Sequence, residues 1–255
     1  MGELDGKVVA ITGAGGGIGT AAAKLFAQEG GKVLLVDVSE EALRRTVNEI
    51  GGDSVSSFVA DVTKPEDNQA FVQAAVQRYG GLDIFLGNAG IEGAVKPITE
   101  YPLDMFNRVI SINLMGPFLG VRFAAPEIAK RGGGAIVLTS SVAGLTGSPG
   151  LSAYTMSKHG VIGLMRTAAV ELAPLNIRVN TVNPAPVETR MMRAIEQQAA
   201  PDAPEQVKSS FEQAIPMKRY ARPEEVARLM LFLASPKTTY ITGGVYTVDG
   251  AMTAI

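Results

Sequence analysis

The amino-acid sequence predicts an α/β fold in which a doubly wound parallel sheet of about seven strands carries helices on both faces. Short, continuously apolar runs, which are typical of strands buried on both sides, alternate with longer amphipathic segments typical of helices. The alternation is regular, and no linker-like change of composition interrupts it. We therefore expect one domain, residues 1–255.

The first half of the chain supplies four of the expected strands. Their apolar runs lie at 7–12, 33–37, 57–60 and 82–86. A helix is expected at 20–29, where Gly30 and Gly31 end it, and another at 65–79, with Pro65 in its first turn. Ser39 is a plausible N-cap for a helix that begins with Glu40 and Glu41.

The second half continues the pattern with three more strands, at 135–139, 177–182 and 245–248. A long helix or helix pair is expected at 103–128, and a further helix at 152–172.

The stretch 188–224 departs from this rhythm, because it is polar, carries Pro201, Pro204 and Pro216, and has only short helix-like pieces. It reads either as a surface insertion or as a lid over a substrate pocket. Long excursions in compact domains are often functional, and its methionines favour the lid.

Composition excludes several classes of function. The net charge is −2 and no basic run alternates with aromatic residues, so a nucleic acid is not an expected partner. No apolar stretch of the ~20 residues that span a bilayer is apparent, and no leader peptide is seen, so we expect a cytoplasmic protein that does not enter a membrane. With no cysteine and one histidine, His159, neither thiol chemistry nor a His-rich metal site is expected. Acid–base chemistry must then come from Tyr, Lys, Asp or Glu.

A glycine-rich turn lies between the first predicted strand and the first predicted helix. Glycines let the backbone approach a pyrophosphate, and the helix N-terminus supplies N–H donors and positive potential. Such a turn is weak evidence alone, because tight turns need glycine anyway, but its place after a strand and before a helix strengthens it. The residues expected to contact a dinucleotide here are Gly13, Gly15, Gly17, Ile18 and Gly19.

Asp37 ends the second predicted strand, where a carboxylate can accept hydrogen bonds from the adenosine ribose. A carboxylate also repels a 2′-phosphate. Two like charges ~4 Å apart cost up to ~4 kcal/mol at an effective dielectric of about 20, and a third of that gives roughly tenfold discrimination. The sequence therefore predicts NAD in preference to NADP. The other interpretation, a simple helix cap, is less favoured because Ser39 serves that purpose.

Tyr154 and Lys158 stand four residues apart at the start of the helix predicted at 152–172, so their side chains share one face. A cation beside a phenol favours the phenolate and lowers its pKa, which suits a general acid or base. The pair occurs often by chance, and a core aromatic beside a solvated lysine is the ordinary alternative. The glycine-rich turn and Asp37 make a dehydrogenase the better interpretation.

At this point the chain resembles the classical short-chain dehydrogenase/reductases over nearly its whole length. The matching motifs are Thr12 to Gly19, Asp61-Val62, Asn88-Ala89-Gly90, Asn113, Ser141, and the pair Tyr154 and Lys158. The resemblance implies a Rossmann fold, a cofactor site that includes Asp61, Val62, Asn88, Ala89, Gly90, Tyr154 and Lys158, and a catalytic set of Asn113, Ser141, Tyr154 and Lys158. It also implies a homotetramer, with the helices at 103–128 and 152–172 and the C-terminal segment at interfaces.

One departure from the family pattern follows the sixth predicted strand. The family usually has Pro-Gly there, near the nicotinamide, whereas this chain has Pro184, Ala185 and Pro186. Proline stiffens the loop and removes an N–H donor. The resemblance still implies cofactor contacts at Pro184, Val187 and Thr189.

The expected activity is NAD-dependent interconversion of a secondary alcohol and a ketone, as an alcohol dehydrogenase or carbonyl reductase. Tyr154 would transfer the proton, Ser141 would bind the substrate oxygen, and Asn113 would hold a water that links Lys158 to solvent. The expected substrate site contains Ser141, Leu145, Leu151, Tyr154, Pro186, Met191 and Met192, most of them apolar. The alternatives are a 3-oxoacyl-carrier-protein reductase, for which Lys130-Arg131 is a fragment of a docking patch, and a non-catalytic dinucleotide sensor.

Overall fold

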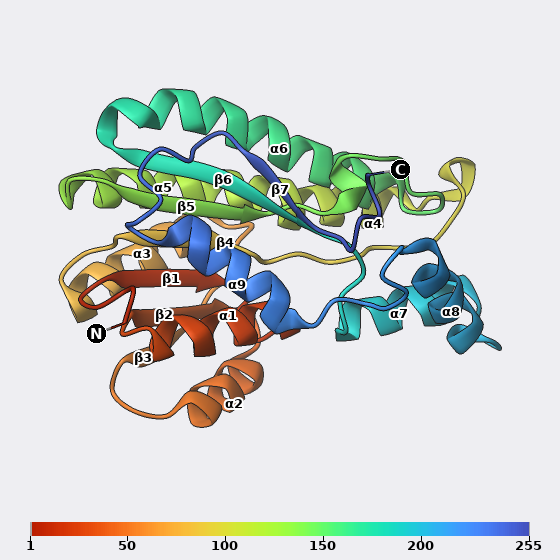
Figure 1. The fold of residues 1–255 in the computed structure, drawn as a ribbon, viewed down its shortest axis with the longest axis horizontal. Coiled ribbons are helices and arrows are strands. Elements are labelled where there is room, and N and C mark those ends of the chain that lie inside the picture. The colour runs from red at the N-terminus through yellow and green to blue at the C-terminus, as the bar shows by residue number, and fades with distance from the viewer. Residues whose placement is uncertain (1, 255) are drawn as a thin grey trace.

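A computed structural model describes residues 2–254 and contains one parallel sheet in the strand order β3-β2-β1-β4-β5-β6-β7 (Figure 1). The strands are β1 Val8–Thr12, β2 Lys32–Asp37, β3 Val55–Val59, β4 Ile84–Gly87, β5 Gly134–Thr139, β6 Ile177–Pro184 and β7 Val245–Val248. The order reverses between β1 and β4, which lie side by side although β2 and β3 come between them in the chain. Ligands of open α/β sheets bind at the carboxyl ends of strands at such a reversal.

Helices cover both faces of the sheet, as the sequence predicts (Figure 1). One face carries α1 Gly17–Gln28, α2 Glu40–Ile50 and α9 Pro223–Ala234. The other face carries α3 Pro65–Tyr79, α5 Gly116–Lys130 and α6 Ser152–Leu172, with α4 Leu103–Ile110 preceding α5. Two further helices, α7 Arg190–Ala199 and α8 Pro204–Ala214, form a separate group beyond the carboxyl end of β6 (Figure 1).

Burial on both faces explains why the strands are continuously apolar. In β1, Val8 and Ala10 face the core formed with α3, α5 and α6, whereas Val9 and Ile11 face the core formed with α1, α2 and α9. All four are at most 2% exposed. Because successive side chains of a strand point to opposite faces, no position from Val8 to Ile11 is left for a polar residue.

The predicted elements are present, with small shifts at their ends. The helix expected at 20–29 begins three residues earlier, at Gly17, because the glycine-rich turn leads directly into α1. Ser39 caps α2 as predicted, accepting a hydrogen bond from the N–H of Ala42 at 3.2 Å. Helix α9 was not predicted, because it begins at Pro223 inside a stretch whose polar composition hid the start of an apolar helix face.

The helix pair expected at 103–128 is a continuous helical run, Leu103–Lys130, interrupted by a π-helical turn at Ser111–Met115. The run is long and apolar enough to cross a membrane by length and composition, which corrects the expectation that no such segment exists. Half of its most apolar window is nevertheless buried inside the protein, where α5 packs on the sheet. Its apolar character is thus accounted for by the domain core.

The polar stretch 188–224 forms α7, α8 and the segment leading into α9. Its two ends are joined: the N–H of Ala221 donates to the carbonyl of Pro186 at 3.0 Å, and the N–H of Glu188 donates to the carbonyl of Ala221 at 2.9 Å. Below, we call residues 188–220 the excursion.

Candidate active site

The glycine-rich turn is joined to the end of β4 by Thr12 and Asn88. The hydroxyl of Thr12 accepts from the N–H of Asn88 at 3.0 Å and of Ala89 at 3.3 Å. The side-chain amide of Asn88 donates to the carbonyls of Thr12 and Gly13, each at 3.3 Å. These bonds bring Gly13, Asn88 and Ala89 together at the sheet reversal, where a dinucleotide is expected.

The turn has the close backbone packing that a dinucleotide site needs. Gly13 has φ +66°, and a Cβ there would lie 2.8 Å from the Cα of Ala89. A Cβ on Gly19 would collide with the carbonyl oxygen of Gly13, and one on Gly17 would lie 2.9 Å from Cγ2 of Thr189. Helix α1 begins without a side-chain cap bond, so its first N–H groups remain available to phosphate oxygens. These residues therefore fit a bound pyrophosphate.

Asp37 is fixed by two backbone donors. Its Oδ2 accepts from the N–H of Gly15 at 3.0 Å and its Oδ1 from the N–H of Ser39 at 3.0 Å. Arg45 reaches the same place from α2, with Nη2 3.4 Å from the carbonyl oxygen of Gly15. Asp37, the predicted ribose-binding acid, thus lies at the end of β2 beside the glycine-rich turn. Arg45, a cation that the sequence analysis missed, lies beside the same residue, Gly15.

Asp61 and Val62 follow β3 and form a tight turn. Oδ1 of Asp61 accepts from the N–H and the hydroxyl of Thr63, at 2.9 and 2.7 Å. Burial by itself would raise the pKa of Asp61, but these bonds and the charge of Lys64 bring that pKa below its usual value. Within residues 2–254 the N–H of Val62 has no hydrogen-bond acceptor, so it is free to donate to a base edge.

Asn113 lies in the π-helical turn and clamps the segment after β4. Its Oδ1 accepts from the N–H of Ile91 at 2.8 Å, and its Nδ2 donates to the carbonyl of Ile91 at 2.9 Å and to Ser157 Oγ at 3.2 Å. A Cβ on Gly90 would lie 3.3 Å from Oδ1 of Asn113 and 3.6 Å from Nζ of Lys158. Gly90, Asn113 and Lys158 therefore meet, although they come from three separate parts of the chain.

The clamp occupies the whole side-chain amide of Asn113, so its backbone carbonyl is the freer group. An α-type hydrogen bond to that carbonyl would have to come from the N–H of Pro117, which has none. A π-turn at this point follows naturally, since π-bulges form where the α-helical ladder cannot continue and are frequent at functional sites.

Lys158 is 4% exposed, and its Nζ donates to the carbonyl of Thr139, at the end of β5, at 2.8 Å. No carboxylate pairs with it within residues 2–254. Burial lowers the pKa of Lys158 to about 8, because water no longer solvates the ammonium. Its Nζ lies 5.5 Å from the centre of the Tyr154 ring.

The expected lowering of the Tyr154 pKa is not found in the protein alone. Burial raises the pKa of Tyr154 to about 12, a hydrogen bond from Ser141 opposes that rise, and the charge of Glu92 adds to it. The sequence indicates the attraction of Lys158, whereas the structure adds the cost of removing a phenolate from water. A phenol with this pKa is protonated at neutral pH.

Ser141 directly follows β5 and Ser140. Its Oγ accepts from the N–H of Ala143 at 3.2 Å and lies 3.4 Å from the carbonyl oxygen of Pro184. Asn183 fixes the Ser141 backbone by donating to its carbonyl at 2.9 Å. The second bond of Oγ is long, so the hydroxyl can turn toward another acceptor at little cost.

The unusual loop after β6 continues the ladder for one residue and then turns outward. The N–H of Ala185 donates to the carbonyl of Val248 at 3.1 Å, and the Ala185 methyl packs in a small apolar cluster with Val142, Ile215 and Tyr220. The methyl that replaces the usual glycine hydrogen thus joins the base of the excursion to the turn that follows Ser141. Pro184, Val187 and Thr189 lie along this loop, with Thr189 beside Gly17.

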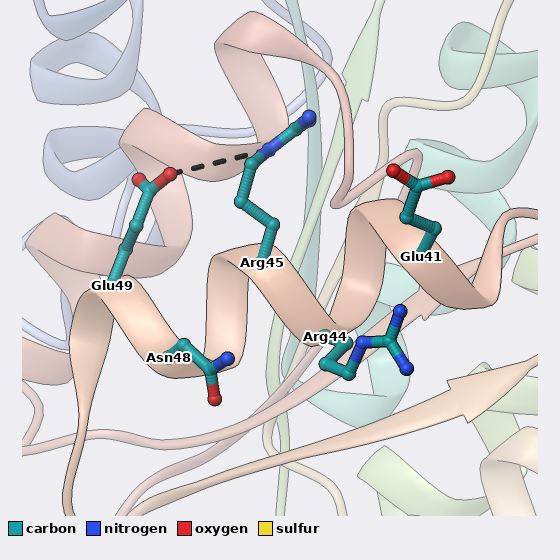
Figure 2. A pocket seen from close by; sticks show the side chains of 5 residues that line it. All are labelled: Glu41, Arg44, Arg45, Asn48 and Glu49. Atoms are coloured by element: carbon teal, nitrogen blue, oxygen red, sulfur yellow. Dashed lines mark ion pairs between the residues drawn. The ribbon is translucent and has the colours of Figure 1, made fainter.

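The predicted substrate residues are distributed around this centre. Leu145 is exposed, Leu151, Pro186, Met191 and Met192 are partly exposed, and Met192 packs on the cluster around Ala185. A surface hollow of about 400 Å³ lies elsewhere: Figure 2 shows it along α2, where charged and polar side chains line it. The residues that line it are Glu41, Arg44, Arg45, Asn48 and Glu49. Its charged lining does not suit a small apolar substrate.

Comparison with known proteins agrees with this geometry. A family described as enoyl-(acyl carrier protein) reductase matches residues 13–253. The chain is 40% identical to a cyclohexanol dehydrogenase of Acinetobacter sp. (strain SE19), over 99% of this chain and 97% of that one. It is 41% identical to a 3-oxoacyl-(acyl-carrier-protein) reductase of Thermotoga maritima, over 98% and 99%.

Two solved structures are similar over nearly their full length. A levodione reductase superposes with a TM-score of 0.95 at 38% identity, covering 98% of this chain and 99% of that chain. A xylitol dehydrogenase with bound NAD⁺ superposes with a TM-score of 0.91 at 36% identity, covering 97% and 99%.

The fold and the site together define an oxidoreductase that uses a nicotinamide dinucleotide. The chain belongs to the short-chain dehydrogenase/reductase family, as its motifs predict.

Proposed function

We propose that this protein is an NAD-dependent enzyme that interconverts a secondary alcohol and a ketone. The observation that carries the proposal is the meeting of Ser141, Tyr154 and Lys158 beside Asn113 and Gly90 at the sheet reversal. When bound, the nicotinamide supplies or accepts the hydride, and the protein binds the substrate and moves the proton.

Tyr154 is the proposed proton donor in ketone reduction. Its raised pKa keeps the hydroxyl protonated at neutral pH, so that Oη can give its proton to the substrate oxygen. In alcohol oxidation the same atom must first lose its proton, so oxidation is expected to become faster as the pH rises above neutral.

Lys158 and Ser141 are proposed to stabilise the charges that form during this transfer. The buried ammonium of Lys158 near the ring favours the phenolate left behind, and its remaining N–H groups are available to the nicotinamide ribose. The Ser141 hydroxyl, held by one firm bond to Ala143, can donate to the substrate oxygen.

Asn113 is proposed to act through two different groups. Its side chain holds Ile91, and its backbone carbonyl, to which Pro117 cannot donate, accepts from a water beside Lys158. Such a water would let Lys158 exchange protons with solvent.

NAD is the proposed cofactor, supported by the carboxylate of Asp37 at the end of β2. Arg45 is the opposing consideration, since a guanidinium close to Gly15 could attract a 2′-phosphate. Arg45 also lies 4.0 Å from Glu49, which compensates part of its charge.

The proposed substrate is a ketone or secondary alcohol with an apolar body, which the residues around Leu145, Leu151 and Met192 would accommodate. A 3-oxoacyl-carrier-protein reductase is the second candidate, favoured by 41% identity to such an enzyme. Its expected docking fragment is already neutralised, however, because Lys130 pairs with Glu127 at 2.8 Å and Arg131 with Asp83 at 3.4 Å. A carrier protein that docks through acidic residues would find little free charge there.

A homotetramer is proposed from apolar side chains that remain exposed on helices α5, α6 and α9. Phe118 on α5, Met156 on α6 and Phe232 on α9 are 45–54% exposed, as is Met115 just before α5, and Tyr240 in the loop after α9 is fully exposed. Large exposed apolar side chains on helices suit association with another copy of the chain. Light scattering on the purified protein measures the assembly directly.

The proposal is tested with a panel of ketones and secondary alcohols and with both NAD(H) and NADP(H), followed at the nicotinamide absorbance. Tyr154→Phe is expected to fold and bind NADH while losing nearly all turnover. Tyr79→Phe, at a partly buried tyrosine whose hydroxyl donates to Ser56 on β3 at 2.8 Å, is the matched control and is expected to keep the wild-type rate. Wild-type turnover by Tyr154→Phe would overturn the catalytic assignment, and turnover of only carrier-bound substrates would favour the second candidate.

A further inference from the structure

The segment 91–96, which follows β4, is held by groups from several parts of the chain. Asn113 bonds both backbone groups of Ile91, and the hydroxyl of Tyr101 accepts from the N–H of Ala94 at 3.1 Å. The N–H of Lys96 donates to the carbonyl of Gly150, in the loop before α6, at 2.9 Å. The segment therefore connects Asn113 with the loop that leads to Tyr154.

Gln198, near the end of α7, makes a two-point contact with the same segment. Its Oε1 accepts from the N–H of Val95 at 3.2 Å, and its Nε2 donates to the carbonyl of Gly93 at 3.2 Å. The side-chain amide thus pairs with the backbone as a neighbouring strand would. The neighbouring Gln197 does nothing similar, because its Nε2 donates to Pro201 within the excursion at 2.9 Å.

These two bonds are the only hydrogen bonds in residues 2–254 that join α7 or α8 to residues outside 186–222. At its base the excursion is held by the backbone pairing of Ala221 with Pro186 and Glu188. Near the same end, the N–H of Met217 donates to the carbonyl of Gly250 at 3.3 Å, and Arg219 pairs with Glu225 of α9 at 2.7 Å. Otherwise its apolar side chains, such as Met192 and Phe211, pack on the cluster around Ala185 and Val142.

The excursion is internally well connected. The hydroxyl of Tyr220 donates to Glu196 at 2.8 Å, and Arg193 pairs with the same carboxylate at 2.8 Å. Lys208 on α8 pairs with Glu188 at 3.0 Å, and both Arg193 and Lys208 lie over the ring of Tyr220. These contacts connect α7, α8 and Tyr220 into one unit.

We infer that Gln198 is the latch that holds the excursion closed over the substrate, and that it thereby sets the affinity for substrate. The inference rests on the proposed function. Gln198 is a positioning residue, since it touches neither the reacting atoms nor the cofactor loop. Two exposed neutral hydrogen bonds contribute little each, which suits a closure that must open in every turnover.

The latch has a measurable consequence for KM. Apparent affinity falls in proportion to the fraction of protein in the binding-competent form. Gln198→Ala is therefore expected to raise KM for the ketone about 5- to 30-fold, the equivalent of roughly 1–2 kcal/mol for the two bonds. The kcat and the KM for NADH are expected to stay within about twofold of wild type. Gln197→Ala, one position away on α7, is the matched control and should change none of these values.

A second measurement follows the contact itself. Hydrogen exchange of the Val95 amide, measured on the full-length protein, is expected to become faster in Gln198→Ala and to stay unchanged in Gln197→Ala. An unchanged KM in Gln198→Ala, or an unchanged rate of exchange at Val95, overturns the inference. If wild-type protein reduces no ketone, the proposed function fails instead, and the exchange measurement still shows whether Gln198 closes the excursion.

Discussion

Replacing Lys158 by methionine is expected to stabilise the protein while it removes activity. The ammonium is 4% exposed, bonds one carbonyl, that of Thr139, and has no acidic partner in residues 2–254. Its pKa falls from 10.5 to about 8. This difference in pKa corresponds to a loss of about 3 kcal/mol in the free energy of unfolding at a pH where Lys158 is charged in both the folded and the unfolded protein.

The net gain is smaller than this figure, because methionine leaves the Thr139 carbonyl without its donor. An unpaired buried carbonyl costs about 1–2 kcal/mol. Lys158→Met is therefore expected to be about 1–2 kcal/mol more stable than wild type at pH 7. For a chain of this size that is a rise in Tm of about 3–6 °C.

The two pKa values of Lys158 also determine how the stability of the wild type changes with pH. Between pH 8 and 10.5 the unfolded state binds more protons than the folded state, so the wild type becomes more stable as the pH rises through this window. Below pH 8 both states are charged and the burial cost is fully present. The advantage of Lys158→Met is thus largest at pH 7 and declines toward pH 10.

Thermal and urea unfolding at pH 7 and pH 9.5, at one protein concentration, test this reasoning. Lys130→Met is the control, because Lys130 is exposed and pairs with Glu127 on the surface, where such a pair contributes at most ~1 kcal/mol. A Lys158→Met variant that is less stable than wild type at pH 7 contradicts the argument, as does an advantage that is the same at both pH values.

Two further predictions concern the cofactor turn. Gly13→Ala is expected to weaken NADH binding at least tenfold and to lower the free energy of unfolding more than Gly51→Ala does. Both glycines have positive φ, so both variants carry the backbone cost. A Cβ at Gly13 would lie 2.8 Å from the Cα of Ala89, whereas a Cβ at Gly51 would meet nothing within 4 Å. Fluorescence titration and urea unfolding measure the two effects, and equal costs would show that crowding at Ala89 is unimportant. Asp37→Asn keeps an acceptor for the backbone but loses the charge, so the kcat/KM with NADP relative to NAD should rise about tenfold. Arg45→Ala should lower that ratio instead, and an unchanged ratio in both variants would locate the selectivity elsewhere.

The sheet and most of the helices could be predicted because each depends on a local pattern. The apolar runs of β1 and β6 are buried on both faces, and Ser39 caps its helix through a bond within one turn. Helix α9 was missed because its first residues are polar, and the apolar face that packs on the sheet begins only at Val226.

The spacing of Tyr154 and Lys158 places those two side chains on one face of α6. Their meeting with Asn113 and Ser141 depended on the family resemblance, since these residues come from separate segments. The structure adds what neither spacing nor resemblance contained. The hydrogen bonds of the Asn113 side chain to Ile91 and Ser157 join distant segments of the chain. The raised pKa of Tyr154 depends on burial, which requires the packed protein. Arg45 and Gln198 were missed because each is an ordinary polar residue on an exposed helix face.

The buried acid Glu196 and the aromatic Tyr220 close the polar network of residues 188–220 upon itself. Few bonds join this network to the sheet, so the free energy of unfolding of the sheet depends little on which residues occupy 188–220. Natural variation can therefore accumulate in these residues and change which molecules the enzyme accepts, while the cofactor half of the protein remains intact. Grafting the whole of 188–220 from a relative, with its own internal ion pairs, is on this view a better route to a new specificity than exchanging its residues one at a time.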